Sequence, residues 1–158
     1  MKRIWIYQAD RFLTSEEERK LNEALEQFNN NWNAHGRKLA SSYEIRHSLF
    51  IILKVDQNHE NASGCSIDSS VHFLQEVEKH FGIQLFNRTL VSFLNNQNEI
   101  QLVSQNKFQE LINQGEVNAN TLVYNNLIQN YEELESNWLI PLHKSWHARV
   151  FDNVSYTA

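Results

Sequence analysis

A run of small, mostly hydroxyl-bearing side chains at positions 62–70, Ala-Ser-Gly-Cys-Ser-Ile-Asp-Ser-Ser, has the residue types best suited to binding chemistry in this chain. The run follows an apolar segment and precedes a helical pattern, and the unpaired N–H groups and the dipole of a helix start favour an anion. Gly64 would allow close backbone approach, and the serine hydroxyls could donate to a phosphate or a carboxylate. The same residue types are also ordinary helix caps, and the charge of Asp68 would compete with an anionic ligand.

We predict a small-anion site at this strand-to-helix turn, with two arginines as helpers if the fold brings them close. The predicted ligand-binding residues are Ser63, Gly64, Cys65, Ser66, Ser69, Ser70, Arg37 and Arg149.

Cys65 offers a second kind of chemistry, because a helix start lowers the pKa of a thiol and so favours the nucleophilic thiolate. A hydrolase could use Cys65 or Asp68 with a nearby histidine such as His35. The spacing supports no named mechanism, since the chain has one cysteine and Val71 stands where a Cys-x5-Arg phosphatase needs arginine. An isolated cysteine is also often a small buried apolar residue.

Histidine pairs raise the question of a metal. His143 and His147 are four residues apart and would share one face of a helix, but no glutamate follows His143 as in H-E-x-x-H. His72, Glu76 and His80 form a row opposite an apolar stripe, which indicates a solvated face. We therefore predict no metal site, with His143 and His147 as the remaining candidates.

Three aspartates stand near predicted strand ends or helix starts, namely Asp10, Asp56 and Asp68. Carboxylates in such places can hold two Mg²⁺ ions for phosphoryl transfer, although aspartate is equally common in turns.

Two segments combine tryptophan, histidine and a cation: residues 32–38 and residues 145–149. Tryptophan and arginine are enriched at binding hot spots. The simpler interpretation, which we favour, is that both tryptophans complete the core and that the cations are solvated.

Sequence patterns typical of strands and of helices follow one another along the chain. Residues 3–8 alternate aromatic and β-branched side chains and predict a strand. Thr14 and Glu17 form a capping box before a helix that should end near residue 33, with Gly36 as its terminator. The other predicted elements are strands at 43–46 and 49–55, a helix at 67–81 ending at Gly82, a hairpin of 90–94 with 99–104, a helix at 107–114 closed by Gly115, and a mainly helical stretch at 122–138.

The order β-α-β-β-α-β-β followed by helices predicts an α+β fold in a single two-layer domain, residues 1–158, with helices packed on a sheet of about five strands. A ferredoxin-like core at about 3–104, with a C-terminal helical extension at about 105–151, is the nearest simple architecture.

Composition excludes several classes of protein. Four glycines, one proline and one cysteine in 158 residues do not suit collagen-like, low-complexity or disulfide-scaffold chains. With 14 basic and 19 acidic residues the formal net charge is −5, which argues against a nucleic-acid partner.

The longest apolar run, 49–53, is far shorter than the roughly 20 residues that span a bilayer, and residues 4–7 are too few for a signal peptide. We expect a soluble cytoplasmic protein with no membrane partner.

The chain resembles an uncharacterised bacterial protein family of about this length, whose members are often labelled "ABC transporter ATPase". The residues that carry the resemblance are Trp5-Ile6-Tyr7-Gln8, Trp32-x-x-His35-Gly36, Ser63-Gly64-Cys65-Ser66-Ile67-Asp68-Ser69-Ser70 and Ser145-Trp146-His147-x-Arg149. The resemblance brings no established activity and no functional residues. The label conflicts with the residues, because none of the four glycines is followed by the lysine of a phosphate-binding G-x-x-x-x-G-K-[ST] loop.

These observations favour a binding or interaction protein over an enzyme, with a small anionic ligand at 62–70 and no cofactor. A hydrolase using Cys65 or Asp68 is one alternative. A subunit of a larger assembly is another, and it predicts an exposed apolar patch around Trp146 and Phe151. A protein partner or a homodimer is compatible with each of these.

Overall fold

The computed structural model describes residues 1–58 and 60–156, and these residues form two compact units. The first unit contains residues 1–87 and 129–132, and the second contains residues 88–128 and those from 133 onward. Helices and antiparallel strands occur in both, so the predicted α+β class is confirmed. That the chain is a single domain stays a prediction. No helix in the described part of the chain is long and apolar enough to cross a bilayer.

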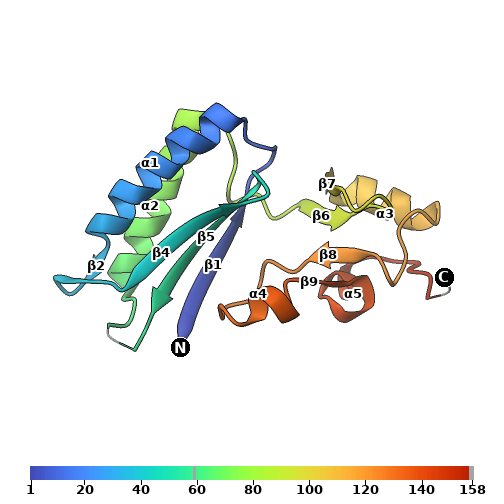
Figure 1. Cartoon of the computed structure of the whole chain (residues 1–158). Helices are drawn as coiled ribbons and strands as arrows, with labels where there is room; N and C mark the ends of the chain where they lie inside the picture. The colour runs from blue at the N-terminus through green and yellow to red at the C-terminus, as the bar shows by residue number, and fades with distance from the viewer. Residues whose placement is uncertain (59, 157–158) are drawn as a thin grey trace. The chain divides into compact units, whose positions relative to one another are not determined.

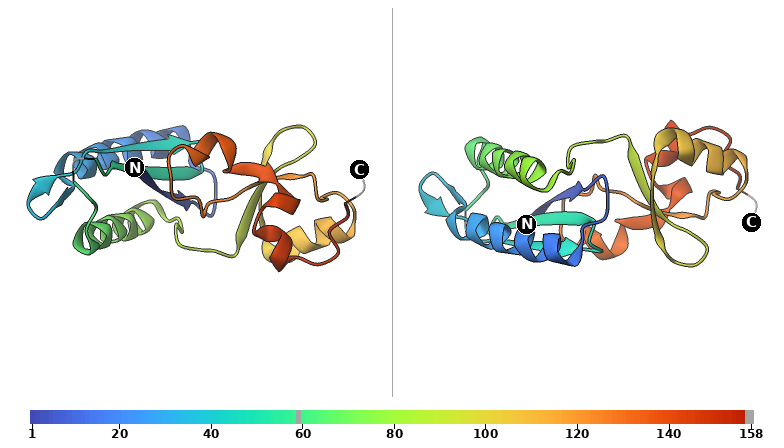
Figure 2. Two further views of the ribbon diagram at one scale, coloured as in Figure 1. Left: turned by 90° about the horizontal axis from the view of Figure 1, so that it is seen from below. Right: turned by 90° about the horizontal axis from the view of Figure 1, so that it is seen from above.

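The first unit is a sheet with two long helices on one face (Figures 1 and 2). Its main sheet has the order β1-β5-β4, and both neighbouring pairs are antiparallel. The elements are β1 (Lys2–Gln8), α1 (Ser15–Asn31), β2 (Asn33–Ala34), β3 (Arg37–Lys38), β4 (Ser41–Arg46), β5 (Phe50–Asp56) and α2 (Gly64–Phe81).

A distant segment, residues 129–132, lies along the free edge of β1. Asn130 forms an antiparallel bridge with Arg3, the Ile4 N–H donates to the Gln129 carbonyl at 2.9 Å, and the Tyr131 N–H donates to the Lys2 carbonyl at 2.9 Å. The order across the sheet is therefore 129–132, β1, β5, β4, which is the antiparallel β-α-β-β-α-β arrangement of a ferredoxin-like unit. The sequence predicted residues 90–94 as the strand that follows α2, but the place beside β1 belongs to 129–132.

The two faces of the sheet differ in what they carry. The face with Tyr7 and Tyr43 meets the helices: the Tyr43 hydroxyl bonds Glu26 of α1, and the Tyr7 hydroxyl bonds Ser70 of α2. The opposite face carries the alternate residues of each strand, because successive side chains of a strand point to opposite faces of the sheet.

Local signals explain the helix ends. The predicted capping box is present at α1, where the Glu17 N–H donates to Thr14 Oγ1 at 3.1 Å and the Thr14 N–H donates to Glu17 Oε1 at 3.0 Å. Gly82 ends α2 in the left-handed region, at φ 64°, as predicted. Gly36 does not terminate α1. With His35 it forms the tight turn of the β2–β3 hairpin, where both residues have positive φ.

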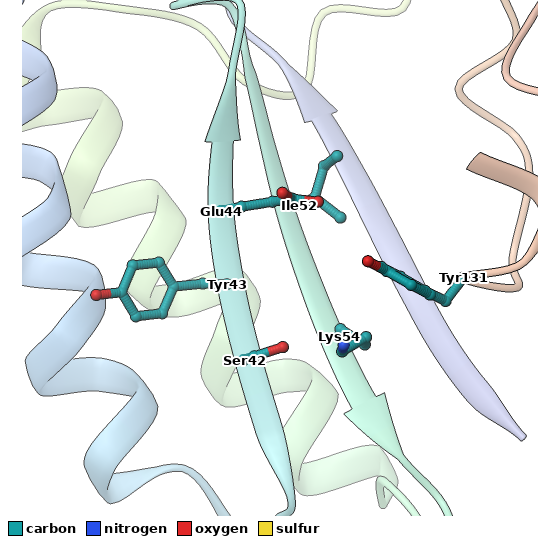
Figure 3. A pocket seen from close by; sticks show the side chains of 6 residues that line it. All are labelled: Ser42, Tyr43, Glu44, Ile52, Lys54 and Tyr131. Carbon is teal, nitrogen blue, oxygen red and sulfur yellow. The ribbon is translucent and has the colours of Figure 1, made fainter. Parts of the chain in front are cut away.

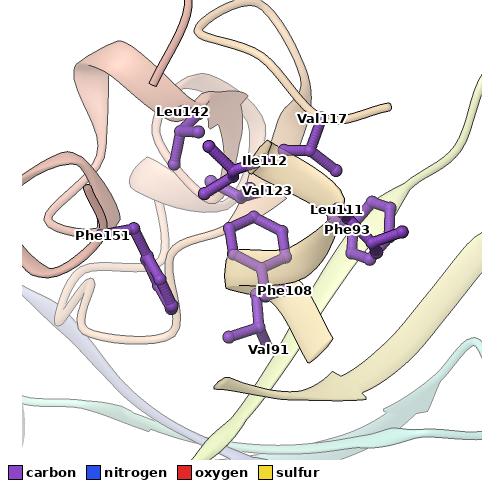
Figure 4. Close-up of a cluster of buried hydrophobic side chains, with 9 residues drawn as sticks. All are labelled: Val91, Phe93, Phe108, Leu111, Ile112, Val117, Val123, Leu142 and Phe151. Atoms are coloured by element: carbon purple, nitrogen blue, oxygen red, sulfur yellow. The ribbon is translucent and has the colours of Figure 1, made fainter. Parts of the chain in front are cut away.

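The second unit has a four-stranded antiparallel sheet of order β7-β6-β8-β9. Its core is built from Phe108, Phe93 and their aliphatic neighbours (Figure 4). The elements are β6 (Leu90–Leu94), β7 (Ile100–Ser104), α3 (Gln105–Asn113), β8 (Leu122–Tyr124), α4 (Glu133–Ser136), β9 (Leu139–Pro141), the 3-10 turn η1 (Leu142–Lys144) and α5 (His147–Val150).

Two expectations about this region need correction. The predicted hairpin of β6 and β7 forms, but it belongs to this second sheet and not to one five-stranded sheet. The predicted helix at 122–138 is wrong: Val123 pairs with Ile140 of β9, and Leu127, placed on its apolar stripe, is 62% exposed. The helical spacing of apolar residues was a coincidence, and β-branched and aromatic side chains at 121–124 favoured a strand. The region 105–151 therefore contains strands as well as short helices.

The turn between β4 and β5 places two non-glycine residues in the left-handed region. His47 has φ 57° and Ser48 has φ 54°, and the Leu49 N–H closes the turn on the Arg46 carbonyl at 3.1 Å. Residues with a Cβ pay a steric cost in this conformation, which glycine avoids.

We predict that Ser48→Gly raises the free energy of unfolding by about 1 kcal/mol, because it removes that cost while keeping the backbone bond from Leu13 N–H to the residue 48 carbonyl. Urea denaturation followed by circular dichroism measures the change. Ser69→Gly within α2 is the matched control and should lower stability by about 0.5 kcal/mol. Destabilisation by Ser48→Gly would contradict the prediction.

Candidate functional site

The serine hydroxyls of 62–70 make hydrogen bonds within the start of α2. Ser63 is the N-cap: its Oγ accepts from the Ser66 N–H at 3.1 Å, and Ser66 Oγ accepts from the Ser63 N–H at 2.7 Å. Ser69 Oγ donates to the Ser66 carbonyl at 2.9 Å, and Ser70 Oγ donates to the Ile67 carbonyl at 2.6 Å. These hydroxyls cap and brace the helix, which is the role that the simpler interpretation of the sequence assigns to them.

Trp32 links the β2–β3 hairpin to this helix start. Its indole N–H donates to the Ser66 carbonyl at 2.8 Å, and the side chain is 2% exposed. Trp5 packs edge-on against it with ring centroids 6.0 Å apart, and the Arg3 guanidinium lies 4.7 Å from the Trp5 ring centre. Trp32 therefore completes the core, as favoured from the sequence.

The remaining candidates at the turn are exposed. Gly64 does not have a left-handed φ, and a Cβ built on it meets no atom within 4 Å, so neither strain nor close contact requires a glycine there. Cys65 and Asp68 are exposed, and among the described residues the Cys65 thiol makes no hydrogen bond to an imidazole. The pairing that the hydrolase hypothesis needs is thus not formed within the described residues.

The two arginines offered as helpers lie in different units. Arg37 is exposed in β3 of the first unit, with Nη1 4.0 Å from Glu60, and His35 is exposed beside it. Arg149 is exposed in α5 of the second unit. The anion site at 62–70 stays a prediction, and its hydroxyls are already engaged.

The three aspartates are dispersed. Asp10 follows the end of β1 and accepts from the Gln84 N–H at 2.8 Å. Asp56 lies at the opposite end of the sheet, since it pairs with Lys2 at the start of β1, and it accepts from the Asn58 N–H at 3.0 Å. Asp68 lies on α2, and the described residues contain no cluster of three groups suited to a metal ion.

The histidine pair also separates. His143 is exposed in η1, whereas His147 is 2% exposed in α5, so the two do not share a helix face. His147 Nδ1 and Ser145 Oγ share a hydrogen bond of 2.6 Å, and Trp146 stacks on the imidazole with ring centroids 3.8 Å apart. Burial lowers the pKa of His147 to about 4, so the ring is neutral near pH 7.

The assembly hypothesis predicted an exposed apolar patch around Trp146 and Phe151, and this prediction is wrong. Phe151 is 8% exposed and packs against Phe108 with ring centroids 4.8 Å apart. Trp146 is half-buried. Phe151 belongs to the second unit's core, and Trp146 stacks on the buried His147.

The first unit has a small polar cavity on the sheet face opposite the helices, which the sequence analysis missed (Figure 3). Its volume is about 100 Å³. The lining residues are Ser42, Tyr43 and Glu44 of β4, Ile52 and Lys54 of β5, and Tyr131 of the edge segment. The side chains of Ser42 and Glu44 point over β5, whereas that of Tyr43 turns away toward α1 (Figure 3).

Pairing across the strands positions these groups. Ser42 is directly opposite Lys54, and Glu44 is directly opposite Ile52, so Lys54 and Glu44 are diagonal neighbours on one face. Tyr131 reaches the cavity because 129–132 pairs with β1, and the Lys54 ammonium lies 4.2 Å from its ring centre.

The two charged residues that line the cavity, Glu44 and Lys54, have different partners. Glu44 is already paired with Arg46 at 3.1 Å. Lys54 is half-buried and forms no ion pair with a carboxylate among the described residues. Its ammonium lies over the aromatic ring of Tyr131 instead. A lysine ammonium without a carboxylate partner attracts an anionic group.

The sequence contains one signal for this site. Lys54 is the single charged residue in the apolar run 49–55, which is otherwise the pattern of a strand buried on both faces. Tyr131 lies far away in sequence, and no local pattern indicates that it returns to this sheet.

Comparison of the chain with protein-family models, with curated proteins and with solved structures finds no match in any of the three. Function is therefore inferred from the chemistry of the site.

The buried imidazole makes stability depend on pH. The unfolded chain protonates His147 below its ordinary pKa of about 6.5, whereas the folded protein resists protonation until about pH 4. The stabilisation is therefore complete above pH 6.5 and falls as pH decreases toward 4, by up to about 3 kcal/mol.

We predict that His147→Asn flattens this dependence, while an amide still bonds Ser145. Urea denaturation at several pH values between 4 and 7.5 measures the slope. His143→Asn, at the exposed histidine of the same unit, should retain the wild-type slope. An unchanged slope in His147→Asn would show that other groups cause the dependence.

Proposed function

We propose that the protein binds a small carboxylate-bearing metabolite, and that the site is the cavity over β4 and β5 in the first unit. One observation carries this proposal: the half-buried residue Lys54 lines a cavity, and its ammonium has no carboxylate partner among the described residues. A lysine ammonium without a carboxylate partner is stabilised by a counter-charge, and a ligand carboxylate supplies one.

The surrounding groups suit a carboxylate. Ser42, opposite Lys54, offers a hydroxyl that can donate to a second oxygen, and Tyr131 supplies another hydroxyl. Ile52 forms an apolar floor. A carboxylate bound by a cation and a hydroxyl forms charge-assisted hydrogen bonds, which are stronger than neutral ones.

The cavity also limits the size of the ligand. A volume of about 100 Å³ has room for several waters or a few non-hydrogen atoms, since one water needs roughly 10–15 Å³ and benzene occupies a cavity of about 150 Å³. A nucleotide is too large. This agrees with the absence from the sequence of a phosphate-binding glycine-lysine loop.

The setting proposed for this function is the cytoplasm of a bacterium, in keeping with the resemblance described above. An exposed, unpaired thiol at Cys65 suits a reducing compartment. Binding, and not catalysis, is proposed because the described residues pair neither Cys65 nor Asp68 with a histidine.

We expect propionate to raise the melting temperature of the wild-type protein and to give a binding isotherm by titration calorimetry. Lys54→Met keeps the length and packing of the side chain but removes the charge, and it should weaken binding by about 10–100-fold through loss of one charge-assisted interaction. Ser42→Ala should weaken it by a smaller factor.

A double variant, Arg37→Met/Ser69→Ala, is the matched control at the turn predicted from the sequence, and it should bind propionate as the wild type does. Binding that survives Lys54→Met and is lost in the double variant would transfer the site to 62–70. Absence of binding by the folded wild-type protein would overturn the proposed function.

A further inference from the structure

The cavity holds two opposite charges that do not meet. Lys54 and Glu44 are diagonal neighbours on the same sheet face, a spacing that long side chains can bridge. Both line the cavity, yet the ion pairs of the described residues join Glu44 to Arg46 and do not join it to Lys54. Both side chains lie on the sheet face that Tyr131 approaches from the edge of the sheet (Figure 3).

We propose that the natural ligand is a small α-amino acid, which bridges this gap as a zwitterion. The inference rests on the proposed function, because it assigns the ligand carboxylate to Lys54 and Ser42. It adds that the ligand ammonium is bound by the Glu44 carboxylate. An α-amino acid zwitterion has its ammonium and carboxylate groups attached to one carbon, which suits two opposite charges that line one small cavity.

Glu44 has the capacity for this role while it remains paired with Arg46. An ionised carboxylate has two oxygens and about four acceptor positions, and the contact with Arg46 Nη2 at 3.1 Å uses one of them. The guanidinium also keeps Glu44 from repelling the ligand carboxylate at the other end of the cavity. The charged residues that line the cavity, Lys54 and Glu44, have formal charges that cancel, and a zwitterion leaves that balance unchanged.

The same arrangement limits the side chain of the ligand. The floor is Ile52, which is 1% exposed, and the cavity volume is about 100 Å³. Backbone atoms of an amino acid occupy much of that space, so a hydrogen, methyl or hydroxymethyl side chain is favoured over an aromatic one. We therefore expect glycine, alanine and serine to bind better than phenylalanine.

The experiment compares L-alanine with two fragments of it: propionate, which lacks the amino group, and ethylamine, which lacks the carboxylate. Titration calorimetry with the full chain should show L-alanine binding at least about tenfold tighter than propionate, since it adds one charge-assisted interaction. Ethylamine, which lacks the carboxylate, should bind more weakly than L-alanine. Glu44→Gln should reduce the preference for L-alanine over propionate from at least about tenfold to within about twofold.

Arg46→Met is the matched control for the lost ion pair. It removes the partner of Glu44 but keeps the Glu44 carboxylate, so it should preserve the preference for L-alanine. Circular dichroism and melting temperature establish that each variant is folded. If Glu44→Gln does not fold, the preference for L-alanine over propionate in the wild type and in Arg46→Met decides the matter.

The outcomes separate the two proposals. Equal affinity for L-alanine and propionate, both lost in Lys54→Met, would overturn the amino-acid inference and retain the carboxylate site. A preference for L-alanine that persists in folded Glu44→Gln would also overturn the inference. Failure of both probes to bind would overturn the proposed function itself.

Discussion

The structure of the first unit depends on a central strand that is buried on both faces. In β5, Phe50, Ile51, Ile52 and Leu53 are each at most 1% exposed, and antiparallel partners flank the strand on both sides. Such a strand tolerates a charged side chain only where a neighbour compensates for lost hydration. Lys54 is that exception, and its ammonium lies over the ring of Tyr131. The proposed site is thus the place where the central strand departs from its own pattern.

That compensation reaches β5 from a distant part of the chain. After α2 the chain builds most of the second unit, returns for residues 129–132 along β1, and then completes the second unit. The returning segment satisfies backbone groups on an edge of the sheet and supplies Tyr131. Pairing with the sheet edge and placing Tyr131 depend on the same contacts, because the backbone bonds from Ile4 to Gln129 and from Tyr131 to Lys2 hold the backbone of Tyr131 beside β1.

At the start of α2, residue types that suggest a ligand site have a structural role instead. Its serines suggested a ligand because hydroxyls at a helix start can donate to an anion. In the folded chain these hydroxyls satisfy the helix's own backbone and one another, and the Ser66 carbonyl also receives the Trp32 indole. A hydroxyl that completes a capping box stabilises the helix, and using it for a ligand would require breaking that bond.

The sequence by itself determined the α+β class, the capping box of α1, the end of α2 at Gly82, and the hairpin of β6 with β7, since these depend on residues that are close in the chain. It also placed a charge inside an apolar strand, at Lys54. Only the tertiary structure decided which strands share a sheet, that 129–132 and not 90–94 borders β1, and that Lys54, Glu44 and Tyr131 surround one cavity. The physical reason is that strand pairing joins backbone groups irrespective of side-chain type, so a local pattern shows that a segment is a strand but not which strand it pairs with.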